Sequence, residues 1–445
     1  MAGKRGRLLF LLLLGAAAGF GLVGLLAQVW RPYEPRLRLI LQTAGQPEVG
    51  GHGPLLLVAS QPISPGSEPD AVIDDLVQTQ VHFEGNILVI DWSDALAPGG
   101  HELQLLGSVR GVDGAQLDLP FTLGFVVRPA ELLFLRPQAG GRWLLRTDGD
   151  SERVMFDRRS VHSYAPDPSG EHVAVAAVND GGGMDLWLVD REGQGELLLN
   201  CAGDSCQQPA WTPDGQRVIF VRLPAGSADE PAQGRLWTIR PDGSEPAPLY
   251  QEESRAGADP VWSPDGRWLA YVDPGQQSVH VLDSDTLAEQ VIPGASGTSG
   301  AWSATSDELA LPMIDLANES PQMHMQAINV LAQSSSLILA ADDGWSAIGE
   351  PAWAPSQDRL ATTAARTGLG HGVWTFRPDG SQIEAVTTDF GYAYGGLAWD
   401  PWGQTLLFQR FPLGTADPEP ELVVWDPGAG FVRQIASASL GRWLP

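Results

Sequence analysis

The chain has 445 residues, 27 of them basic and 54 acidic, and its formal net charge of −27 argues against nucleic-acid binding. Hydrophobic residues make up 43% of the chain and charged residues 18%, a composition that folds rather than stays disordered. The 16 Trp, 52 Gly and 35 Pro indicate a turn-rich β protein. Lys4 is the only lysine, so Schiff-base, P-loop and Ser-Lys chemistry are excluded from the folded part.

The N-terminal segment predicts a membrane anchor. A basic stretch, residues 1–7, precedes residues 8–30, which carry no charge and are long enough as a helix to cross a hydrocarbon core of about 30 Å. The alternative is a cleaved signal peptide with its apolar core at 8–14. By the positive-inside bias, the basic start stays in the cytoplasm. We therefore expect a single-pass cell-membrane protein with the bulk of the chain extracytoplasmic, or a secreted protein after cleavage.

A short Pro/Arg linker, residues 31–37, leads to a segment of period-2 strands, residues 38–129. Residues 77–83 alternate apolar and polar side chains, and the turn Glu84-Gly85-Asn86 leads into the apolar run 87–90. Further strands are expected at 101–106 and 121–127, separated by turn residues. Several short strands with turns between them predict a β-sandwich. The order of hairpin, Leu-Ala-Pro-Gly, strand, Val-Asp-Gly and closing strand resembles the bacterial Ig-like domains of the SbsA type.

From residue 130 onward the chain repeats a motif of an aromatic residue followed by Pro and Gly. The anchors of successive copies are separated by 45, 51, 40, 51 and 46 residues, and an aliphatic residue follows each anchor by seven positions. A period in the forties with short strands predicts a β-propeller over residues 130–445. The three good copies begin at Trp211, Trp262 and Trp399, and the three weaker ones at Pro166, Trp302 and Trp353.

The motif has a local physical reason. Pro fixes φ for a tight turn, Asp accepts hydrogen bonds from the amides of the turn, and Gly supplies a positive φ. Because the Trp recurs in the same register, we expect it to pack between blades rather than to bind a ligand. The runs Trp211-Thr-Pro-Asp-Gly-Gln-Arg-Val and Trp262-Ser-Pro-Asp-Gly-Arg-Trp-Leu resemble the TolB-type (PD40, WD40-like) propeller family. The resemblance covers about 310 residues.

The two ends of the repeat region suggest how the propeller closes. Residues 131–156 resemble second, third and fourth strands without a first strand, whereas residues 441–445 resemble a first strand with nothing after it. We therefore expect the end of the chain to complete the opening blade, which gives seven blades and removes the sheet edge. Six blades is the alternative.

The cysteines predict a disulfide bond rather than a metal site. Cys201 and Cys206 lie in one short loop of an exported chain, where thiols are oxidised. A zinc site needs about four ligands, and the eight His show no ligand spacing. The run Met323-His324-Met325 could suggest copper, but on a strand both Met side chains share one face, and we expect them to pack. No cofactor is expected.

No catalytic motif is evident. The chain has no Gly-x-Ser-x-Gly, no phosphate loop, no calcium loop and no Ser/His/Asp grouping that can be defended from sequence. The favoured function is therefore a membrane-anchored, extracytoplasmic binding scaffold whose partner is a protein, a peptide or a glycan. The alternative is a propeller enzyme, a hydrolase or lyase, with its site at the channel mouth.

Loop lengths indicate where a partner would bind. Turns between first and second strands are short, so the longer loops gather on the other face of the propeller, where function tends to lie. This long-loop face is expected to be acidic, although a solvated surface would explain the charge as well. Its expected charged residues are Asp204, Asp229, Glu230, Glu252, Glu253, Asp259, Asp342, Asp343, Glu350, Asp389, Asp417 and Glu419, with Arg222, Arg255, Arg366 and Arg410.

The candidate ligand-binding residues lie three positions before each anchor, where the chain enters the innermost strand. Mostly polar side chains there would surround the mouth of the channel and favour a cation, a basic peptide or a hydroxyl-rich ligand, or would simply hold water. Two aromatic residues in the loop before the last anchor could cover a bound group. The candidates are Ser163, Gln208, Asp259, Ser299 and Glu350, together with Tyr392 and Tyr394.

Overall fold

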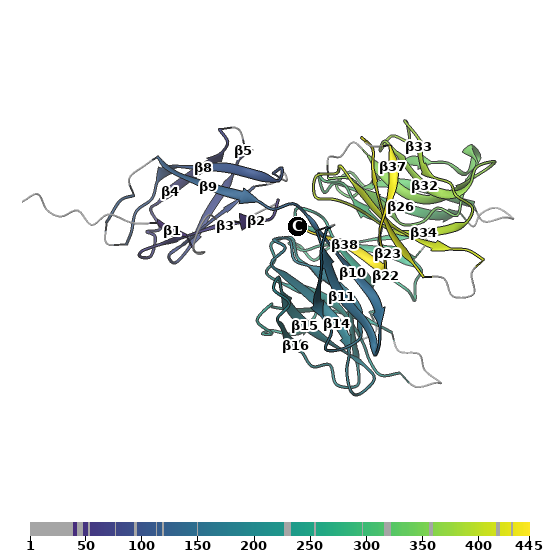
Figure 1. Ribbon diagram of the computed structural model, residues 1–445, viewed down its shortest axis with the longest axis horizontal. Helices are drawn as coiled ribbons and strands as arrows, with labels where there is room; N and C mark the ends of the chain where they lie inside the picture. The colour runs from purple at the N-terminus through teal and green to yellow at the C-terminus, as the bar shows by residue number, and fades with distance from the viewer. Residues whose placement is uncertain are drawn as a thin grey trace, which may run out of the picture. The chain divides into compact units, whose positions relative to one another are not determined.

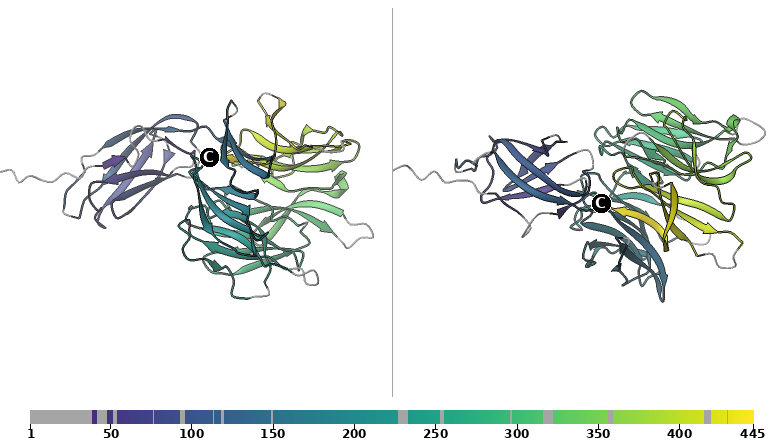
Figure 2. Two further views of the ribbon diagram at one scale, coloured as in Figure 1. Left: turned by 60° about the horizontal axis from the view of Figure 1, so that its bottom comes forward. Right: turned by 45° about the horizontal axis from the view of Figure 1, so that its top comes forward.

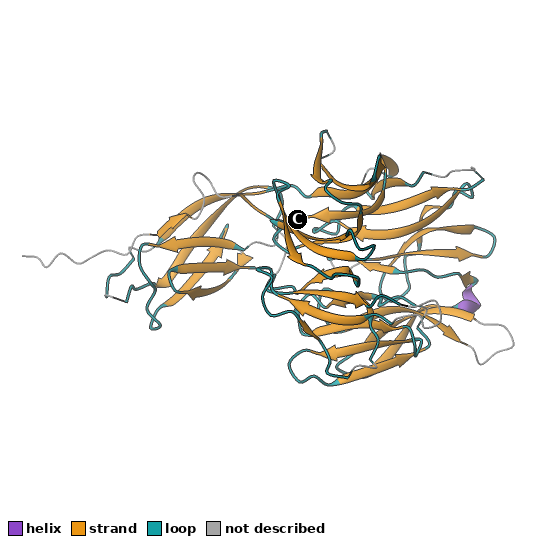
Figure 3. Cartoon of the chain, turned by 90° about the horizontal axis from the view of Figure 1, so that it is seen from below, coloured by secondary structure: helices purple, strands orange, loops and turns teal. Residues whose placement is uncertain are grey.

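The computed structural model describes residues 39–41, 48–51, 54–75, 77–92, 96–112, 114–117, 120–148, 150–226, 233–252, 255–295, 297–315, 322–355, 359–414, 419–428 and 430–445. Figure 3 shows that strands dominate this part of the chain, and the 3-10 turn Ala341–Asp343 (η1) is its one helical element. The all-β class expected from the sequence is confirmed. The segments predicted as anchor and linker, 8–30 and 31–37, lie outside the described residues. Within the described part, no helix has the length and apolar character needed to cross a bilayer.

The chain divides into two compact units, and the larger one contains all of Gly124–Pro445. Residues 39–127 form two sheets, with strand orders β1-β3-β7-β6 and β2-β9-β8-β4-β5 (Figure 1). Burial alternates along these strands, as period-2 patterning requires, and Gly85 (φ 60°) makes the predicted turn between β6 and β7. The strands are β1 (Leu39–Leu41), β2 (Glu48–Val49), β3 (Leu55–Ala59), β4 (Glu68–Ile73), β5 (Val77–Gln78), β6 (Gln80–Glu84), β7 (Ile87–Asp91), β8 (Gly99–Ser108) and β9 (Phe121–Val127).

The first half of the repeat region forms two sheets, in which strands that follow one another in the chain pair antiparallel. The first sheet has the order β12-β11-β10-β38, and the next is an eight-stranded sheet whose halves meet at the single pair Met184 and Ser205. Its strands are β10 (Glu131–Gln138), β11 (Gly141–Thr147), β12 (Glu152–Phe156), β13 (Val161–Pro166), β14 (His172–Val178), β15 (Met184–Asp190), β16 (Gly195–Leu199), β17 (Ser205–Trp211), β18 (Val218–Leu223), β19 (Arg235–Ile239) and β20 (Ala247–Pro248).

The second half continues the pattern with four more sheets, which Figure 2 shows as separate stacks of strands. Three of these sheets have four strands. The sheet that contains β31 has five, because the short β29 also pairs with β31. Their strands are β21 (Ala258–Trp262), β22 (Trp268–Asp273), β23 (Ser278–Asp283), β24 (Glu289–Pro293); β25 (Ala301–Trp302), β26 (Glu308–Asp315), β27 (Gln322–Asn329), β28 (Ser334–Leu339); β29 (Trp345–Ser346), β30 (Pro351–Trp353), β31 (Leu360–Arg366), β32 (Gly370–Phe376), β33 (Glu384–Thr387); and β34 (Tyr392–Trp399), β35 (Leu406–Pro412), β36 (Glu421–Asp426), β37 (Phe431–Ser437).

The last strand, β38 (Ser439–Leu444), pairs with β10, more than 300 positions earlier in the chain, as Figure 1 shows in yellow beside blue. Leu132 lies opposite Trp443 in this antiparallel pair, and Leu444 is fully buried. The predicted pairing of the chain's end with residues 131–135 is therefore confirmed. The sheet edge of β10 is covered by this pairing, which removes a site for unwanted strand association.

The repeated tight turns form as the motif predicts. At the first good copy, Gly215 (φ 68°) donates its N–H to the carbonyl oxygen of Thr212 at 2.8 Å, and the N–H of Gln216 binds Oδ1 of Asp214 at 3.0 Å. Gly266 (φ 74°) takes the same position in the second copy. These hydrogen bonds satisfy the backbone of the turn locally, so few residues join the first and second strands.

The repeated Trp side chains pack between consecutive sheets, as expected. Trp211 and Trp302 are buried, and in four copies the indole N–H donates to the carbonyl of the residue just before the preceding anchor. The indole nitrogens of Trp262 and Trp353 are buried without such an acceptor, although the two side chains are only partly buried. The four hydrogen bonds are Trp211 to Ala165 (3.0 Å), Trp302 to Val261 (3.1 Å), Trp399 to Ala352 (3.2 Å) and Trp443 to Ala398 (3.1 Å).

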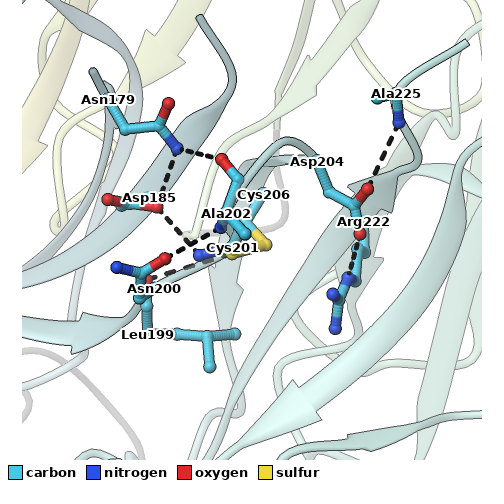
Figure 4. The surroundings of a disulfide bond; sticks show 10 residues. All are labelled: Asn179, Asp185, Leu199, Asn200, Cys201, Ala202, Asp204, Cys206, Arg222 and Ala225. Carbon is cyan, nitrogen blue, oxygen red and sulfur yellow. Dashed lines mark hydrogen bonds and ion pairs between the residues drawn. A yellow bond between two sulfur atoms is a disulfide. The ribbon is translucent and has the colours of Figure 1, made fainter. Parts of the chain in front are cut away.

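Cys201, which lies between β16 and β17, forms the predicted disulfide bond with Cys206, which lies in β17 (Figure 4). Both residues are buried beside Trp211 and Leu186 in one hydrophobic cluster. The bond therefore fixes the start of β17 at the entry to an innermost strand.

Candidate functional site

A β-bulge recurs three residues before the repeated Trp. The pairing register of the innermost strand shifts at this point in the sheets that begin with β17, β21 and β34. Such a bulge inserts an extra residue and directs its side chain away from the regular ladder. The backbone there is left-handed, with φ of 51° at Gln208, 52° at Asp259, 59° at Gly396 and 52° at Leu440.

Hydrogen bonds connect the candidate residues from one innermost strand to the next. Oγ of Ser163 accepts the N–H of Gln208 at 3.0 Å, and Oε1 of Gln208 accepts the N–H of Asp259 at 3.1 Å. Oδ2 of Asp259 accepts the N–H of Ser299 at 3.1 Å, while the Ser299 hydroxyl donates to the Asp259 carbonyl. Four of the predicted residues thus form one continuous chain of contacts, which crosses β13, β17 and β21 and ends in the segment before β25.

Glu350 joins this group through charge. Burial is the main cause that raises the pKa of the Glu350 carboxyl, and the negative charge of Asp259 raises it further, while Arg442 opposes both. The residue is nevertheless exposed to solvent, although many protein atoms surround its carboxyl. We call Ser163, Gln208, Asp259, Ser299 and Glu350 the inner-strand cluster.

Sequence reasoning missed Arg442, the cation that acts on Glu350. Arg442 lies on β38 immediately before Trp443 and is exposed. The sequence does contain a signal for Arg442. If Trp443 is aligned with the repeated Trp as a further anchor, Leu440 falls at the bulge and Arg442 on the innermost strand. The left-handed residue Leu440 confirms this alignment, because its φ matches those of Gln208 and Asp259.

Tyr392 and Tyr394 lie at the start of β34, and their contacts are with each other and with their own surroundings. Tyr394 is buried, its ring packs 6.1 Å from that of Phe408, and its hydroxyl donates to the carbonyl of Asp389 at 3.0 Å. The Arg410 guanidinium lies 4.3 Å from the centre of the Tyr392 ring. None of these contacts connects the two tyrosines to the inner-strand cluster.

The carboxylates expected on the long-loop face are partly neutralised by arginines. Asp204 pairs with Arg222 at 2.8 Å, and Glu252 lies 3.8 Å from Arg255. Arg410 pairs with Glu421, which was not among the expected residues. Arg366 lies over the Trp345 ring, and Asp342 and Asp343 belong to η1. Asp229, Glu230, Glu253 and Asp417 lie outside the described residues.

Met323 and Met325 pack as expected from their shared face. Met325 is fully buried, and Met323 packs against the same cluster, whereas His324 interacts with Gln326 at 2.8 Å. Within the described residues, no group of three or more His, Cys, Asp or Glu side chains is arranged to hold a metal ion.

A Ser–His–Glu grouping that the sequence did not reveal lies on β23 and β24. Nε2 of His280 is 3.1 Å from the Ser278 hydroxyl, and its Nδ1 is 3.1 Å from Oε1 of Glu289. Nδ1 is not aligned for a hydrogen bond, and both Ser278 and His280 are 3% exposed. Burial lowers the pKa of His280. A substrate could not reach this hydroxyl, so the grouping is structural.

No protein-family model matches the sequence. The Tol-Pal system protein TolB of Rhizorhabdus wittichii is 30% identical over 84 residues, which is 19% of this chain and 18% of that protein. Protein HIR1 of Gibberella zeae is 27% identical over 135 residues, which is 28% of this chain and 13% of HIR1. The chain thus spans less than a fifth of the length of these curated relatives.

Solved structures with a similar fold include TolB-like propellers and several enzymes. Puromycin hydrolase has a TM-score of 0.52 and 14% identity, with 69% of this chain and 51% of that chain covered. A structure from a study of two prolyl endopeptidases has a TM-score of 0.51 and 13% identity, with coverage of 68% and 49%. A TolB-like protein from Agrobacterium tumefaciens has a TM-score of 0.42 and 17% identity, with coverage of 55% and 84%. At these identities the similarity shows the fold alone.

Proposed function

We propose that this chain is a membrane-anchored, extracytoplasmic binding protein that holds a protein partner on the long-loop face of a TolB-like propeller. The inner-strand cluster carries the proposal. Its side chains are polar, and hydrogen bonds link Ser163, Gln208, Asp259 and Ser299. Gln208 and Asp259 stand at left-handed bulges. A left-handed non-Gly residue costs about 1–2 kcal/mol, and such strain concentrates at functional sites.

The proposed architecture follows from the sheets. Counting the halves of the eight-stranded sheet as separate blades gives seven blades of four strands, one of them extended by the short β29, with β38 as the innermost strand of the first. We propose that the two sheets of residues 39–127 form an Ig-like sandwich in front of the propeller, since their strands bury alternate residues. Residues 8–30 would anchor the chain in the cell membrane.

The proposed partner is a protein with both basic and apolar side chains at its contact surface. Asp259 and Glu350 supply negative charge in the inner-strand cluster, and four exposed apolar residues lie on the loops of the last two sheets or, for Phe411, near the end of β35. The N–H of Leu413 binds the carbonyl of Gly391 at 2.7 Å, so their loops are adjacent. Exposed apolar side chains that lie together mark interaction sites. They are Leu369 (46% exposed), Phe390 (73%), Phe411 (36%) and Leu413 (57%).

Site-specific photocrosslinking in the full-length chain tests which face binds the partner. A photoreactive residue in place of Phe390 should capture a discrete protein in the cell envelope, and the same residue in place of Asp242 should not. Asp242 is a matched control because it lies in the short turn after β19, at the opposite end of the sheets. Equal capture from both positions, or capture from Asp242 alone, would refute a binding role for the long-loop face.

The propeller-enzyme alternative draws support from the folds of puromycin hydrolase and prolyl endopeptidase. Under this alternative the site would lie in the inner-strand cluster, where the raised pKa of Glu350 would suit a general acid. Turnover of a glycan, lactone or peptide substrate that is lost in the Glu350→Gln variant would favour the enzyme over the binding protein.

A further inference from the structure

A pocket of about 290 Å³ opens beside the disulfide loop, away from the inner-strand cluster. It is formed by the connection from β14 to β15, by β15, and by the segment from β16 to β17. In propeller topology these connections belong to the long-loop face, because they join second to third strands and one blade to the next. Its volume is near the lower limit of about 300 Å³ for ligand pockets, so it suits one small ring.

The pocket contains a buried carboxylate with a free oxygen. Asp185 is 8% exposed, and its Oδ1 accepts the N–H of Cys201 at 2.8 Å and the amide of Asn179 at 2.9 Å (Figure 4). Its Oδ2 has no partner among the described residues. This oxygen is not among the fully enclosed side-chain atoms that lack a partner, so it is available to a donor on a ligand in the pocket.

The turn around Asp185 is rigid, so the carboxylate is preorganised. The Asn179 amide also donates to the carbonyl of Ala202 at 2.8 Å, and its Oδ1 accepts the N–H groups of Gly181 and Gly183 at 3.0 Å. The disulfide bond closes the segment that supplies Cys201 and Ala202. A ligand would therefore meet a fixed acceptor without having to order the loop, which favours binding.

The other lining groups suit a neutral, hydroxyl-bearing ligand. Arg159 and Asp180 pair with each other at the rim, which leaves the single charge of Asp185. Trp187 and Val178 offer apolar surface, and the indole N–H of Trp187 has no acceptor among the described residues. Asn200 uses Oδ1 to bind the N–H of Ala202 at 2.9 Å and has a free amide N–H₂. The pocket thus offers a ligand one hydrogen-bond acceptor, two hydrogen-bond donors and an apolar wall.

The repeat itself does not require this carboxylate. Trp187 aligns with Trp237 in the next blade, and Asp185 aligns with Arg235. Arg235 instead donates to the carbonyls of Tyr250 and Glu252 at 3.0 and 3.1 Å. The aspartate is therefore a feature of this blade, whereas the aromatic residue belongs to the scaffold.

We propose that this pocket binds a neutral sugar residue. Sugar hydroxyls would donate to Oδ2 of Asp185 and accept from Asn200 and Trp187, and the carbon face of the ring would pack on the apolar wall. An anionic ligand would be repelled by Asp185. A metal ion would find one carboxylate where several ligands are needed.

Saturation-transfer NMR with the full-length protein and the methyl glycosides of glucose, galactose, mannose and N-acetylglucosamine tests the proposal. At least one should bind with a Kd in the millimolar range. The isosteric Asp185→Asn variant retains the contacts of Oδ1 and should weaken binding about tenfold or more, because it replaces a charged acceptor by a donor. Asp190→Asn, on the other end of β15, is the matched control and should leave the Kd unchanged.

Further measurements distinguish binding at this pocket from binding at the inner-strand cluster, and a neutral sugar from other classes of ligand. Reducing the disulfide should weaken sugar binding, and the Asp259→Ala/Glu350→Ala variant should not. Failure of all four glycosides to bind, or equal binding by wild type and Asp185→Asn, would overturn the proposal. Binding of methylamine or glucuronate in preference to every neutral glycoside would overturn it as well.

Discussion

At the residue scale, the left-handed positions of the bulges are the most informative feature of the inner strands. Gln208 and Asp259 have side chains that accept hydrogen bonds from the next strand, which offsets the cost of their backbone conformation. Leu440 adopts the same conformation with a side chain that is 44% exposed. Only its backbone is used: its N–H binds Oε1 of Gln409 at 2.8 Å.

Replacing Leu440 by Gly should therefore stabilise the protein. Gly removes a left-handed penalty of about 1–2 kcal/mol, but it loses about 0.5–1 kcal/mol more backbone entropy on folding, so the net gain is up to about 1.5 kcal/mol. Leu440→Ala, which keeps Cβ, is the control and should give no gain. Urea unfolding measures both variants. A Gly variant no more stable than the Ala variant would show that the backbone at this position is unstrained.

Glu350 should make stability depend on pH. Its pKa is raised in the folded state, so the folded protein binds this proton more tightly than the unfolded chain does. The carboxyl's contribution is therefore most favourable below the unfolded pKa of about 4.3, and is lost as the pH rises through the folded pKa. Glu350→Gln should have a higher Tm than wild type at pH 7, and the difference should shrink near pH 4.

The matched control for that titration is Glu384→Gln, which changes an exposed carboxyl on the outer strand β33. Its Tm should follow that of wild type at both pH values. If Glu350→Gln melted below wild type at pH 7, the interaction with Arg442 would outweigh burial and the repulsion from Asp259.

At the element scale, β38 is the strand on which closure of the repeat region depends. It pairs with β10, and Trp443 donates to Ala398 in the neighbouring sheet. Trp443 also packs against a cluster that includes Phe134 and Leu407, which belong to those two sheets. One short strand therefore connects the first and last parts of the repeat.

Deleting the last six residues should destabilise the chain strongly. The change removes most of the β10–β38 pairing and the Trp443 side chain, and loss of a core aromatic alone costs about 3–5 kcal/mol. Trp443→Phe is the milder comparison and should cost about 1 kcal/mol for the lost indole hydrogen bond, plus a packing term. Melting is measured by circular dichroism. An unchanged melting curve after the deletion would contradict closure by β38.

The disulfide loop is the second element with a clear expectation. Closing so short a loop should stabilise the folded state by about 2 kcal/mol. The Cys201→Ser/Cys206→Ser variant should lose that amount in urea unfolding. In native exported protein, neither thiol should react with an alkylating agent before reduction. Alkylation of both cysteines in such material would show that the bond does not form in the cell.

At the scale of the whole molecule, the repeat made much of the fold predictable. Local turn chemistry and the Trp register predicted the strands, the β10–β38 pairing and the packing of Trp211 and Trp302. The candidate site was harder to predict from the sequence. Placement three residues before each anchor brought four polar residues together, but a bulge decides where side chains point, and bulges leave no clear sequence pattern. Tyr394 illustrates this limit, because an expected surface aromatic is buried.

The central claim is that the inner-strand cluster forms part of a binding site. The most direct measurement is the Kd of the crosslinked partner for the full-length wild-type chain and for Asp259→Ala/Glu350→Ala. The control is Glu196→Ala/Glu384→Ala, which removes two exposed carboxylates from the outer strands β16 and β33. We expect the cluster variant to remain folded and to lose at least about a hundredfold in affinity, while the control keeps its affinity. Equal affinities of the cluster variant and wild type would contradict the claim.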